Sequence, residues 1–207
     1  MKVWSEWLFP RFLDWSAANN EELKALRART LAAASGRVLE LGFGTGLNLG
    51  HYPPGVRRIV AVDPNPGMAR RARARIAAAG IEIEHHPITA EALPFEARSF
   101  DSVVCTLTLC SIPAVAAALR EVHRVLRPGG QFLFFEHGRH PDANTYRWQR
   151  RLNPLWRRVF DGCNIDRDMA GLVSASGLQL TAIDNPVLQH VPRPVGYCYL
   201  GRAERRD

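Results

Sequence analysis

Short apolar runs alternate with amphipathic stretches through the first two thirds of the chain. Runs typical of strands occupy residues 37–41, 58–62, 81–86, 100–109 and 131–137. Apolar residues at helical spacing lie before or between these runs, at 20–34, 66–79 and 113–126. Asn19 and Glu22 are spaced to form a capping box at the first of these helices. The alternation indicates βαβ units, and it predicts an α/β fold in which helices cover both faces of a doubly wound, mostly parallel sheet.

The pattern changes after residue 140. Residues 145–165 are aromatic, basic and interrupted by Pro154, and residues 166–177 predict a short helix. Two final strands are predicted at 178–185 and 195–205. We therefore expect a single domain over residues 1–207. Its expected parts are an N-terminal helical lid, a cofactor-binding core, a substrate-side insertion and C-terminal strands, at residues 1–35, 36–138, 139–176 and 177–207.

The composition is typical of a soluble globular protein, with 46% hydrophobic and 23% charged residues in a chain of 207. No stretch approaches the roughly 20 apolar residues of a membrane span, and the start resembles no signal peptide. The four cysteines form neither a C-x-x-C pair nor a cluster with zinc spacing. These features favour a cytoplasmic protein with reduced thiols and no metal.

Aromatic and basic segments raise the question of a surface partner. Five aromatic residues could give the N-terminus a peripheral membrane contact, or could pack over the core: Trp4, Trp7, Phe9, Phe12 and Trp15. The net charge of +7 comes almost entirely from arginine, with clusters in residues 67–80 and 146–160. A basic face suits nucleic acid, acidic lipid or an anionic substrate, although a solvated helix face has the same composition.

Three glycines follow the first predicted strand, at Gly42, Gly44 and Gly46. Glycines between a strand and a helix let backbone N–H groups approach a ligand closely. The spacing is G-x-G-x-G, because Leu47 stands where a dinucleotide-binding turn needs its third glycine. Asp63 closes the next strand, where an acid can accept hydrogen bonds from ribose hydroxyls. Together these residues predict a nucleoside ligand without a diphosphate bridge.

Residues 37–138 carry a family resemblance. In order, they resemble the motifs of class I S-adenosylmethionine (SAM)-dependent methyltransferases of the type 11 group, at VLELGFGTG, AVDPNPGM, AEALPFEARSFDSVVCTLTLCSI and LREVHRVLRPGGQFLFFEHG. The resemblance implies SAM as the cofactor and a Rossmann-like, seven-stranded sheet whose last strand is antiparallel. It also implies cofactor-binding residues: Glu40, Gly42, Gly44 and Gly46 around the methionine part, Asp63 at the ribose, Asn65 and Met68 near the adenine, Thr89, Ala90 and Glu91 at the adenine edge, and Thr106 and Leu107 at the methionine end.

A narrower resemblance covers most of the chain. It rests on NPLWRRVFDGCNIDRD, CTLTLCSI, FFEHG and the ending with Pro, Gly and Tyr. These segments are similar to the methyltransferase-like group whose mammalian members are membrane-associated thiol S-methyltransferases. The resemblance implies a small, apolar thiol as the acceptor. Those members carry an N-terminal hydrophobic anchor, whereas this chain has its amphipathic aromatic segment there.

Methyl transfer to a thiol needs an in-line nucleophile and a thiolate, and only a few per cent of a free thiol with a pKa of about 8.5 is ionised at neutral pH. Candidate bases are His137 just past a strand, Asp161 and His190. Each also has a structural interpretation, as a hydrogen-bonding or capping residue. We interpret Cys163 as a small buried residue, because direct transfer needs no covalent protein intermediate.

Three other functions stay open at this point. SAM-dependent methylation of a phospholipid amine or an isoprenoid quinol would suit the basic, aromatic segment after residue 140. A nucleic-acid methyltransferase would suit the charge, but the chain lacks the Asn/Asp-Pro-Pro-aromatic run of amino-group DNA methyltransferases at the exit of the fourth strand. A non-catalytic SAM-binding domain would need the same glycines and Asp63.

Overall fold

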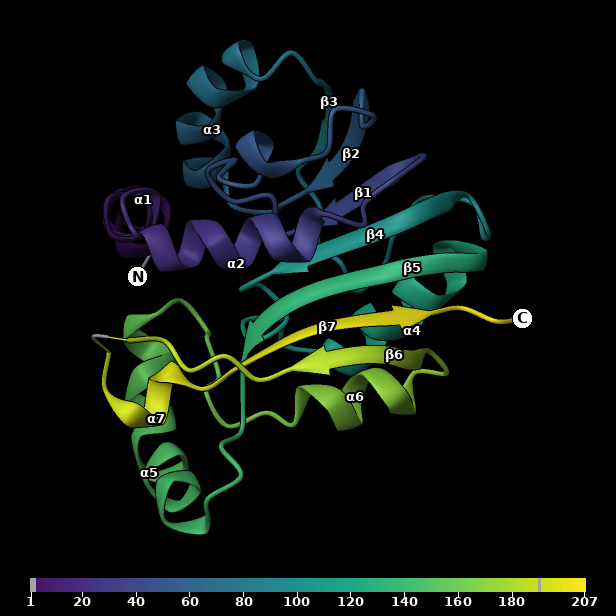
Figure 1. Cartoon of the computed structure of the whole chain (residues 1–207). Coiled ribbons are helices and arrows are strands. Elements are labelled where there is room, and N and C mark those ends of the chain that lie inside the picture. Colours follow the sequence, from purple (N-terminus) through teal and green to yellow (C-terminus); the bar gives the residue numbers. More distant parts are fainter. Residues whose placement is uncertain (1–2, 190) are drawn as a thin grey trace.

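In the part of the chain that the structure describes, residues 3–189 and 191–207 of a computed structural model, seven strands form one mixed sheet (Figure 1). The strands are β1 (Val38–Leu41), β2 (Arg58–Val62), β3 (Glu82–His86), β4 (Phe100–Thr106), β5 (Leu126–His137), β6 (Gln179–Asp184) and β7 (Cys198–Glu204). Their order is β3-β2-β1-β4-β5-β7-β6. Strands β1 to β5 pair in parallel, and β7 is antiparallel to both β5 and β6. The arrangement confirms the predicted α/β class and the antiparallel last strand.

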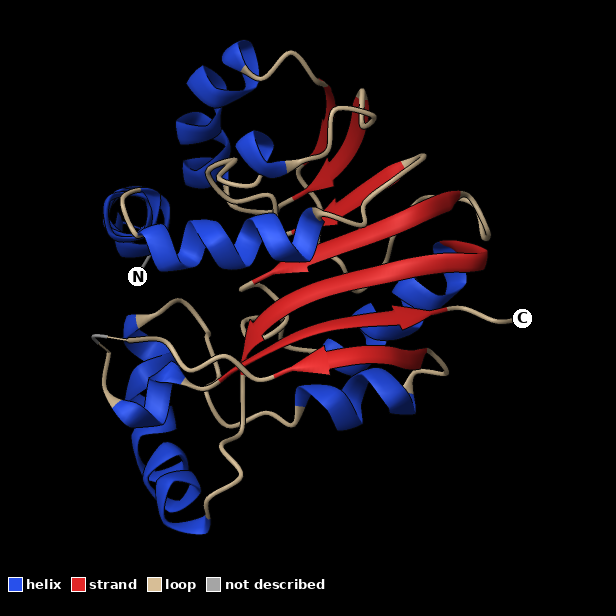
Figure 2. Cartoon of the chain, viewed as in Figure 1, coloured by secondary structure: helices blue, strands red, loops and turns tan. Residues whose placement is uncertain are grey.

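Helices cover both faces of the sheet (Figure 2). They are η1 (Trp4–Leu8), α1 (Phe9–Ala18), α2 (Glu21–Leu31), η2 (Leu49–His51), α3 (Pro66–Ala78), α4 (Val115–Val125), α5 (Ala143–Val159), α6 (Met169–Ala175) and α7 (Arg193–Gly196). Apolar residues of α2 and α3 belong to the cluster on one face, and those of α4 and α6 belong to the cluster on the other. In Figure 1, α2 crosses in front of the sheet.

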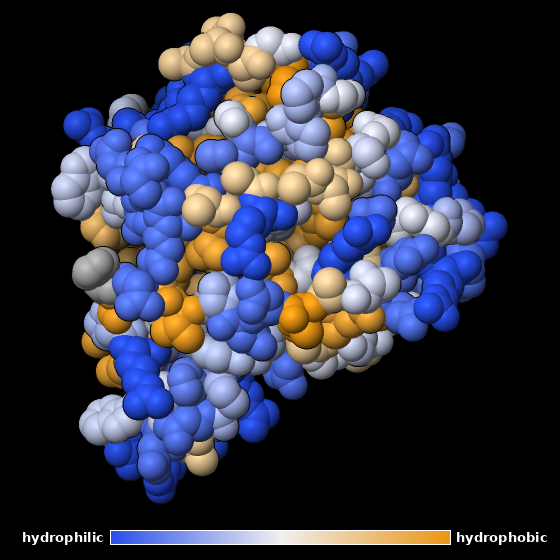
Figure 3. Space-filling model, viewed as in Figure 1, coloured by the Kyte–Doolittle hydropathy of each residue, from blue (hydrophilic) through white to orange (hydrophobic). Residues whose placement is uncertain are grey.

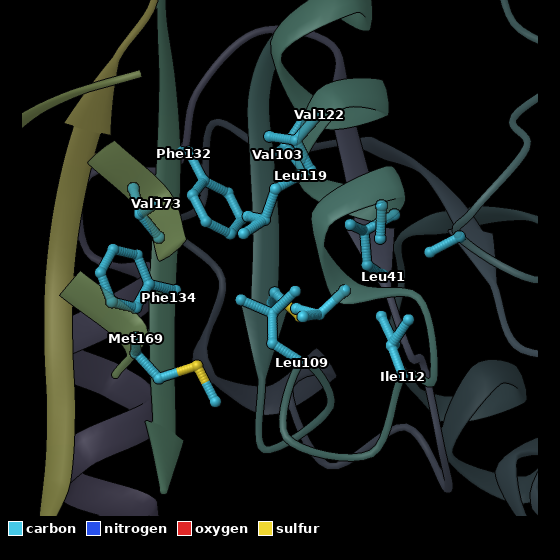
Figure 4. Packing of buried hydrophobic residues seen from close by; sticks show 14 of the residues in the cluster. Leu41, Val103, Leu109, Ile112, Leu119, Val122, Phe132, Phe134, Met169 and Val173 are labelled. Carbon is cyan, nitrogen blue, oxygen red and sulfur yellow. The ribbon is translucent and has the colours of Figure 1, made fainter. Parts of the chain in front are cut away.

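The larger apolar cluster lies between the sheet and the pair α4 and α6 (Figure 4). The helical spacing over 113–126 is confirmed, because α4 buries the predicted side chains Val115, Ala118, Leu119, Val122 and Val125. Figure 4 shows Leu119 beside Val103 of β4, and Phe134 of β5 beside Met169 of α6. Burying a side chain of this size contributes about 1.5–3 kcal/mol, so this face holds much of the stability of the fold.

The strand order determines where a ligand can bind. From β1 the chain goes to β2 and β3 on one side, and then returns to β4 on the other side. The loops after β1 and β4 therefore diverge at the carboxyl edge of the sheet. In open α/β sheets, ligands bind in the crevice at such a point.

Several of the predicted boundaries were wrong. Strand β5 begins at Leu126 and not at residue 131, and β7 begins at Cys198, after the short helix α7, and not at residue 195. The strand predicted over 100–109 ends at Thr106, because Leu107 has a φ of 53° and turns the chain away from the sheet. The interruption expected at Pro154 does not occur, and α5 continues through this residue to Val159. Proline removes one helical hydrogen bond, yet the helix continues, and the side chain of the neighbouring Asn153 is hydrogen bonded to Asp166 and to the Ile165 N–H.

The cap of α2 is also one residue away from its predicted place. Asn20, and not Asn19, is the N-cap, and its side chain accepts a hydrogen bond from the Leu23 N–H at 3.0 Å. Glu21 and Glu22 lie in the first turn, where the positive end of the helix dipole favours them. Asn19 instead follows the last turn of α1.

Candidate functional site

The glycine loop after β1 is the first part of the site. Gly42, Gly44 and Gly46 have φ values of 70°, 57° and 79°, which side chains other than glycine rarely adopt. A Cβ on Gly42 would collide with the side chain of Thr108, in the loop after β4. A Cβ on Gly44 would meet nothing closer than the Gly42 carbonyl at 3.9 Å. The loop after β1 therefore packs directly against the loop after β4 at Gly42. At Gly44 no atom of the chain packs against it.

Asp63 lies at the end of β2 and is hydrogen bonded to this loop. Its Oδ2 accepts from the Gly44 N–H at 2.7 Å, and its Oδ1 accepts from the Asn65 N–H at 2.8 Å. Burial raises the pKa of the Asp63 carboxyl, and the two backbone N–H groups oppose that effect. A carboxylate can accept about four hydrogen bonds, so each oxygen retains capacity for a ligand. The structure thus brings together the acid and the glycines that the sequence singled out.

Asn65 and Met68 are placed by the start of α3. The Asn65 side chain caps this helix by accepting from the N–H groups of Gly67 and Met68, and its Nδ2 donates to the Ser5 carbonyl at 3.0 Å. Gly67 lies directly under η1, because a Cβ there would collide with the Glu6 carbonyl. The N-terminal segment is therefore packed on the predicted adenine end of the site.

The three predicted adenine-edge residues lie in the turn after β3. Thr89 is exposed, and Ala90 is buried in the cluster under α4. The Glu91 carboxylate accepts from the Ala114 N–H at 3.3 Å, at the start of α4. This turn is thus fastened to the loop that follows β4, on the same edge of the sheet as Asp63.

Thr106 is the last residue of β4 and Leu107 follows it. Both were predicted for the methionine end of the site. The buried Thr106 hydroxyl accepts from the Arg27 guanidinium at 2.7 Å and from the Asn48 amide at 3.0 Å. The Leu107 N–H donates to the Phe135 carbonyl at 2.7 Å. A positive φ at a leucine costs about 1–3 kcal/mol, and such conformations concentrate at functional sites.

A network of buried polar side chains lies next to the glycine loop. Most of its members were not predicted from the sequence. Glu40 is 1% exposed and accepts from the Asn48 amide at 2.8 Å and from the Tyr52 hydroxyl at 2.7 Å. The Arg27 guanidinium of α2 donates to the Asn48 side-chain Oδ1 at 2.8 Å. Burial raises the pKa of Glu40 to about 7, against its hydrogen bonds to Tyr52 and Asn48, and lowers the pKa of Arg27 to about 10. An arginine in an amphipathic helix carries no sequence signal that it is buried.

Glu136 is a further buried residue at this edge of the sheet that the sequence analysis missed. This carboxylate has no exposed surface and accepts from the N–H groups of Thr108, Leu109 and Cys110 at 2.9, 3.0 and 3.2 Å. Burial raises the pKa of Glu136, and these three hydrogen bonds oppose that effect. It therefore fixes the loop after β4. An acid inside the otherwise apolar run of β5 was the available signal.

The structure describes two of the three candidate bases, and these two make separate contacts. His137 faces the C-terminal segment, with its Nδ1 at 3.6 Å from the Cys198 Sγ, and burial lowers the pKa of its imidazole to about 4. Asp161 is exposed, has a φ of 46° and accepts from the Ser5 hydroxyl at 2.9 Å. Its charge contributes to the raised pKa of Asp63, so the two carboxylates lie near each other. His190 lies outside the described residues.

The segments before and after the core meet over the carboxyl edge. The Trp4 indole donates to the Val159 carbonyl at 3.0 Å, and the rings of Phe12 and Phe160 lie 6.2 Å apart. In Figure 1, α1 and α5 lie at the end of the molecule toward which β4 and β5 point.

Cys163 behaves as the sequence analysis expected, in that it is buried. Its Sγ lies 3.4 Å from that of Cys110, whose backbone N–H donates to Glu136. The neighbouring Cys110 thiol lowers the pKa of Cys163, against the effect of burial. The contact joins the segment after α5 to the loop after β4.

Comparison with known proteins gives the family. Residues 39–134 match the family described as methyltransferase domain. The human thiol S-methyltransferase TMT1A is 36% identical over 212 aligned residues, which cover 94% of this chain and 84% of TMT1A. The human thiol S-methyltransferase TMT1B is 39% identical over 144 residues, which cover 67% of this chain and 59% of TMT1B.

A solved structure supports the fold independently. The crystal structure of YcgJ from Bacillus subtilis superposes with a TM-score of 0.69 at 22% identity. The superposition covers 91% of this chain and 100% of the YcgJ chain. At this identity the likeness concerns the fold alone.

The network under the glycine loop makes a testable prediction about stability. The pKa of Glu40 is raised to about 7 in the folded chain, above its value of about 4.3 in an unfolded chain. This residue's contribution to stability is thus complete below pH 4.3 and is lost as the pH rises through 7. We expect the free energy of unfolding to fall, between pH 4.5 and 8, by up to about 3 kcal/mol more in the native chain than in Glu40→Gln.

Urea unfolding of both proteins across this pH range checks the prediction. Changes in other titrating groups cancel in the comparison, because the two chains differ only at this carboxyl. Parallel stability curves would show that Glu40 is ionised as easily in the folded chain as in the unfolded chain.

Proposed function

Because the chain belongs to the class I SAM-dependent methyltransferase family, we propose that it transfers the methyl group of SAM to a small, apolar thiol. The chain is a SAM-dependent methyltransferase. The proposal concerns the acceptor of the methyl group, which we infer to be a thiol. The observation that carries it is the 36% identity with a thiol S-methyltransferase over 94% of the chain. This similarity extends well beyond residues 39–134, so it includes most of the segments that flank the cofactor-binding core.

The residues at the carboxyl edge fit SAM. Space at Gly44, where a Cβ would meet no atom within 3.9 Å, leaves the backbone accessible to a ligand. The Asp63 carboxylate has capacity for the two ribose hydroxyls, since each of its oxygens accepts one backbone N–H. We assign the methionine part to Glu40, the three glycines and the chain at Thr106 and Leu107. We assign the adenine to Asn65, Met68 and the turn at 89–91.

The flanking segments have their own proposed roles. In this proposal residues 1–35 form a lid over the nucleoside, and residues 139–176 form the acceptor side. The contacts of Ser5 with Asn65 and with Asp161 support it, because they join the lid to both halves of the site.

When bound, SAM supplies a methyl group attached to a positively charged sulfonium. The sulfur leaves as a neutral thioether, so the leaving group needs no proton. The chain must therefore hold the acceptor in line and favour its thiolate. Arg167 suits this second task. Its guanidinium is half-buried, donates to the Leu109 carbonyl and lies beside the loop that Glu136 fixes. A positive charge in such a place lowers the pKa of a thiol bound next to it.

His137, Asp161 and His190 are proposed as acceptor-side residues. With a pKa of about 4, His137 is neutral near pH 7 and can accept a hydrogen bond from the thiol. Full proton transfer to it from a thiol with a pKa of about 8.5 is strongly unfavourable. We therefore assign the proton to solvent, with His137 orienting the acceptor and Asp161 at the exposed side of the site.

The assignment of Asp63 makes a direct prediction. Asp63→Ala removes the acceptor for the ribose hydroxyls, and loss of hydrogen bonds to a charged group costs about 1.5–3 kcal/mol. We expect SAM affinity to fall tenfold to a hundredfold, as measured by isothermal titration calorimetry. Asp184→Ala, which removes an exposed carboxylate from β6, is the matched control and should bind SAM normally. Unchanged affinity in a folded Asp63→Ala protein would refute the ribose assignment.

The acceptor is tested by competition among chemical classes. The full chain is incubated with methyl-labelled SAM and with an alkyl thiol, the alcohol and amine of the same chain length, phosphatidylethanolamine vesicles, a quinol and RNA. We expect the label on the thiol. Label on the lipid, the quinol or RNA alone would leave the family assignment intact and overturn the thiol. Tight SAM binding without label on any acceptor would favour a non-catalytic SAM-binding domain.

A further inference from the structure

Two cysteine side chains touch each other where the segment after α5 meets the loop after β4. The Sγ atoms of Cys110 and Cys163 are 3.4 Å apart, although 53 positions separate them in the sequence. The other two cysteines have different neighbours, since Cys105 contacts a glutamate carboxylate and Cys198 contacts a histidine ring. In the part of the chain that the structure describes, Cys110 and Cys163 are therefore the one pair of thiols in contact.

Hydrogen bonds that do not involve the thiols hold these two cysteines together. The Cys110 carbonyl accepts from the Asn164 N–H at 2.9 Å and from the Asn164 side-chain amide at 2.8 Å. The Cys110 N–H donates to the buried Glu136 carboxylate at 3.2 Å. In the other segment, the Cys163 N–H donates to the Phe160 carbonyl at 3.0 Å. The fold thus keeps both sulfurs at short range, which makes a reaction between them effectively unimolecular.

The surroundings of Cys163 favour its thiolate. Its pKa is lowered chiefly by the Cys110 thiol, and further by the Trp156 N–H and the charge of Arg167, against the effect of burial. The buried Trp156 Nε1 has no hydrogen-bond partner among the described residues, so a thiolate beside it satisfies this donor. Contact with Cys163, together with burial, raises the pKa of Cys110. Cys163 is therefore the more reactive sulfur of the pair, because the thiolate is the nucleophile.

Access to this pair is narrow. Cys110 is 1% exposed and Cys163 is 8% exposed. Figure 3 shows a surface on which hydrophilic residues surround apolar patches, and the two cysteines contribute almost nothing to the surface of the molecule. A reagent that reaches Cys163 must therefore be small and uncharged. Hydrogen peroxide meets both conditions, whereas a bulky, charged disulfide does not.

From this arrangement we propose that Cys110 and Cys163 form a redox site, at which hydrogen peroxide converts the two thiols into a disulfide. The Cys163 thiolate attacks one peroxide oxygen and the O–O bond breaks. The other oxygen leaves as water with the proton that the thiol released, and Cys163 becomes a sulfenic acid. The Cys110 sulfur then attacks this sulfur, an S–S bond forms, and the hydroxyl leaves as water with the Cys110 proton. The two thiols are oxidised by two electrons in all, and the peroxide is reduced to two molecules of water.

Closing the disulfide would draw two segments of the chain together. The sulfurs approach from 3.4 Å to about 2.05 Å, so the segment after α5 and the loop after β4 must shift. The same loop carries Thr108, which packs against Gly42. A displacement of about 1 Å at a reacting centre costs up to about a hundredfold in rate. Oxidation would therefore slow methyl transfer, a consequence that rests on the proposed function, whereas formation of the disulfide does not.

The test is peptide mass spectrometry of the full, folded chain after exposure to hydrogen peroxide, with the remaining thiols alkylated before digestion. Arginines such as Arg120 place Cys110 and Cys163 on different tryptic peptides, so the disulfide joins two peptides into one species. We expect this species in the native chain and its loss after treatment with dithiothreitol. It should be absent from Cys163→Ala and from Cys110→Ala. It should form normally in Cys198→Ala, the matched control that removes another buried thiol.

Three results would overturn the proposal. They are no cross-linked species in the folded chain, a cross-link that joins other cysteines in preference, and oxidation of Cys163 to the sulfinic acid without a disulfide. A cross-link that forms as readily in urea as in the folded chain would contradict it as well, because the contact made by the fold would then have no part in the reaction. Since SAM and the acceptor are absent from this test, its failure is distinguishable from failure of the thiol assay.

Discussion

A buried carboxylate holds the site together. Glu136 has no exposed surface, and it accepts three successive backbone N–H groups from the loop after β4. Burying such a charge is costly unless hydrogen bonds satisfy it, and here the same hydrogen bonds end β4 and shape the loop. The loop in turn brings Thr108 against Gly42 and Cys110 against Cys163. One side chain thus connects the glycine loop after β1 with the segment that follows α5.

The other half of the site has a similar construction. Glu40 lies under the glycine loop with Asn48 and Tyr52, and Arg27 reaches the same network from α2. Asp63 completes it by accepting from the Gly44 N–H. Polar groups that are buried and satisfied in this way rigidify a structure, because breaking any one of them leaves its partner unpaired. The family chemistry needs little more than such a rigid cleft, since the transferred methyl group leaves a neutral thioether.

The fold could be predicted from the sequence, and so could the meeting of the glycine loop with Asp63, because their signals are local. Alternating apolar runs predict strands and helices, and an acid at the end of the next parallel strand comes to the same edge of the sheet as the glycines. The partners of these residues could not be predicted in the same way. Arg27 and Glu136 act through contacts across the fold, and a buried arginine in a helix resembles an exposed one until α2 is docked. Gln149 of α5 is a further example, because its buried amide nitrogen lies within hydrogen-bonding distance of carbonyls from three distant parts of the chain.

The most direct test of this account is a crystal structure of the full chain with S-adenosylhomocysteine, the product that SAM leaves after transfer. The account predicts that the ribose hydroxyls lie within hydrogen-bonding distance of Asp63, with the homocysteine part between the glycine loop and the chain at Leu107. Its thioether sulfur would then face the segment that follows α5. A ligand bound elsewhere, or bound at the carboxyl edge without contact to Asp63 and the glycine loop, would contradict it.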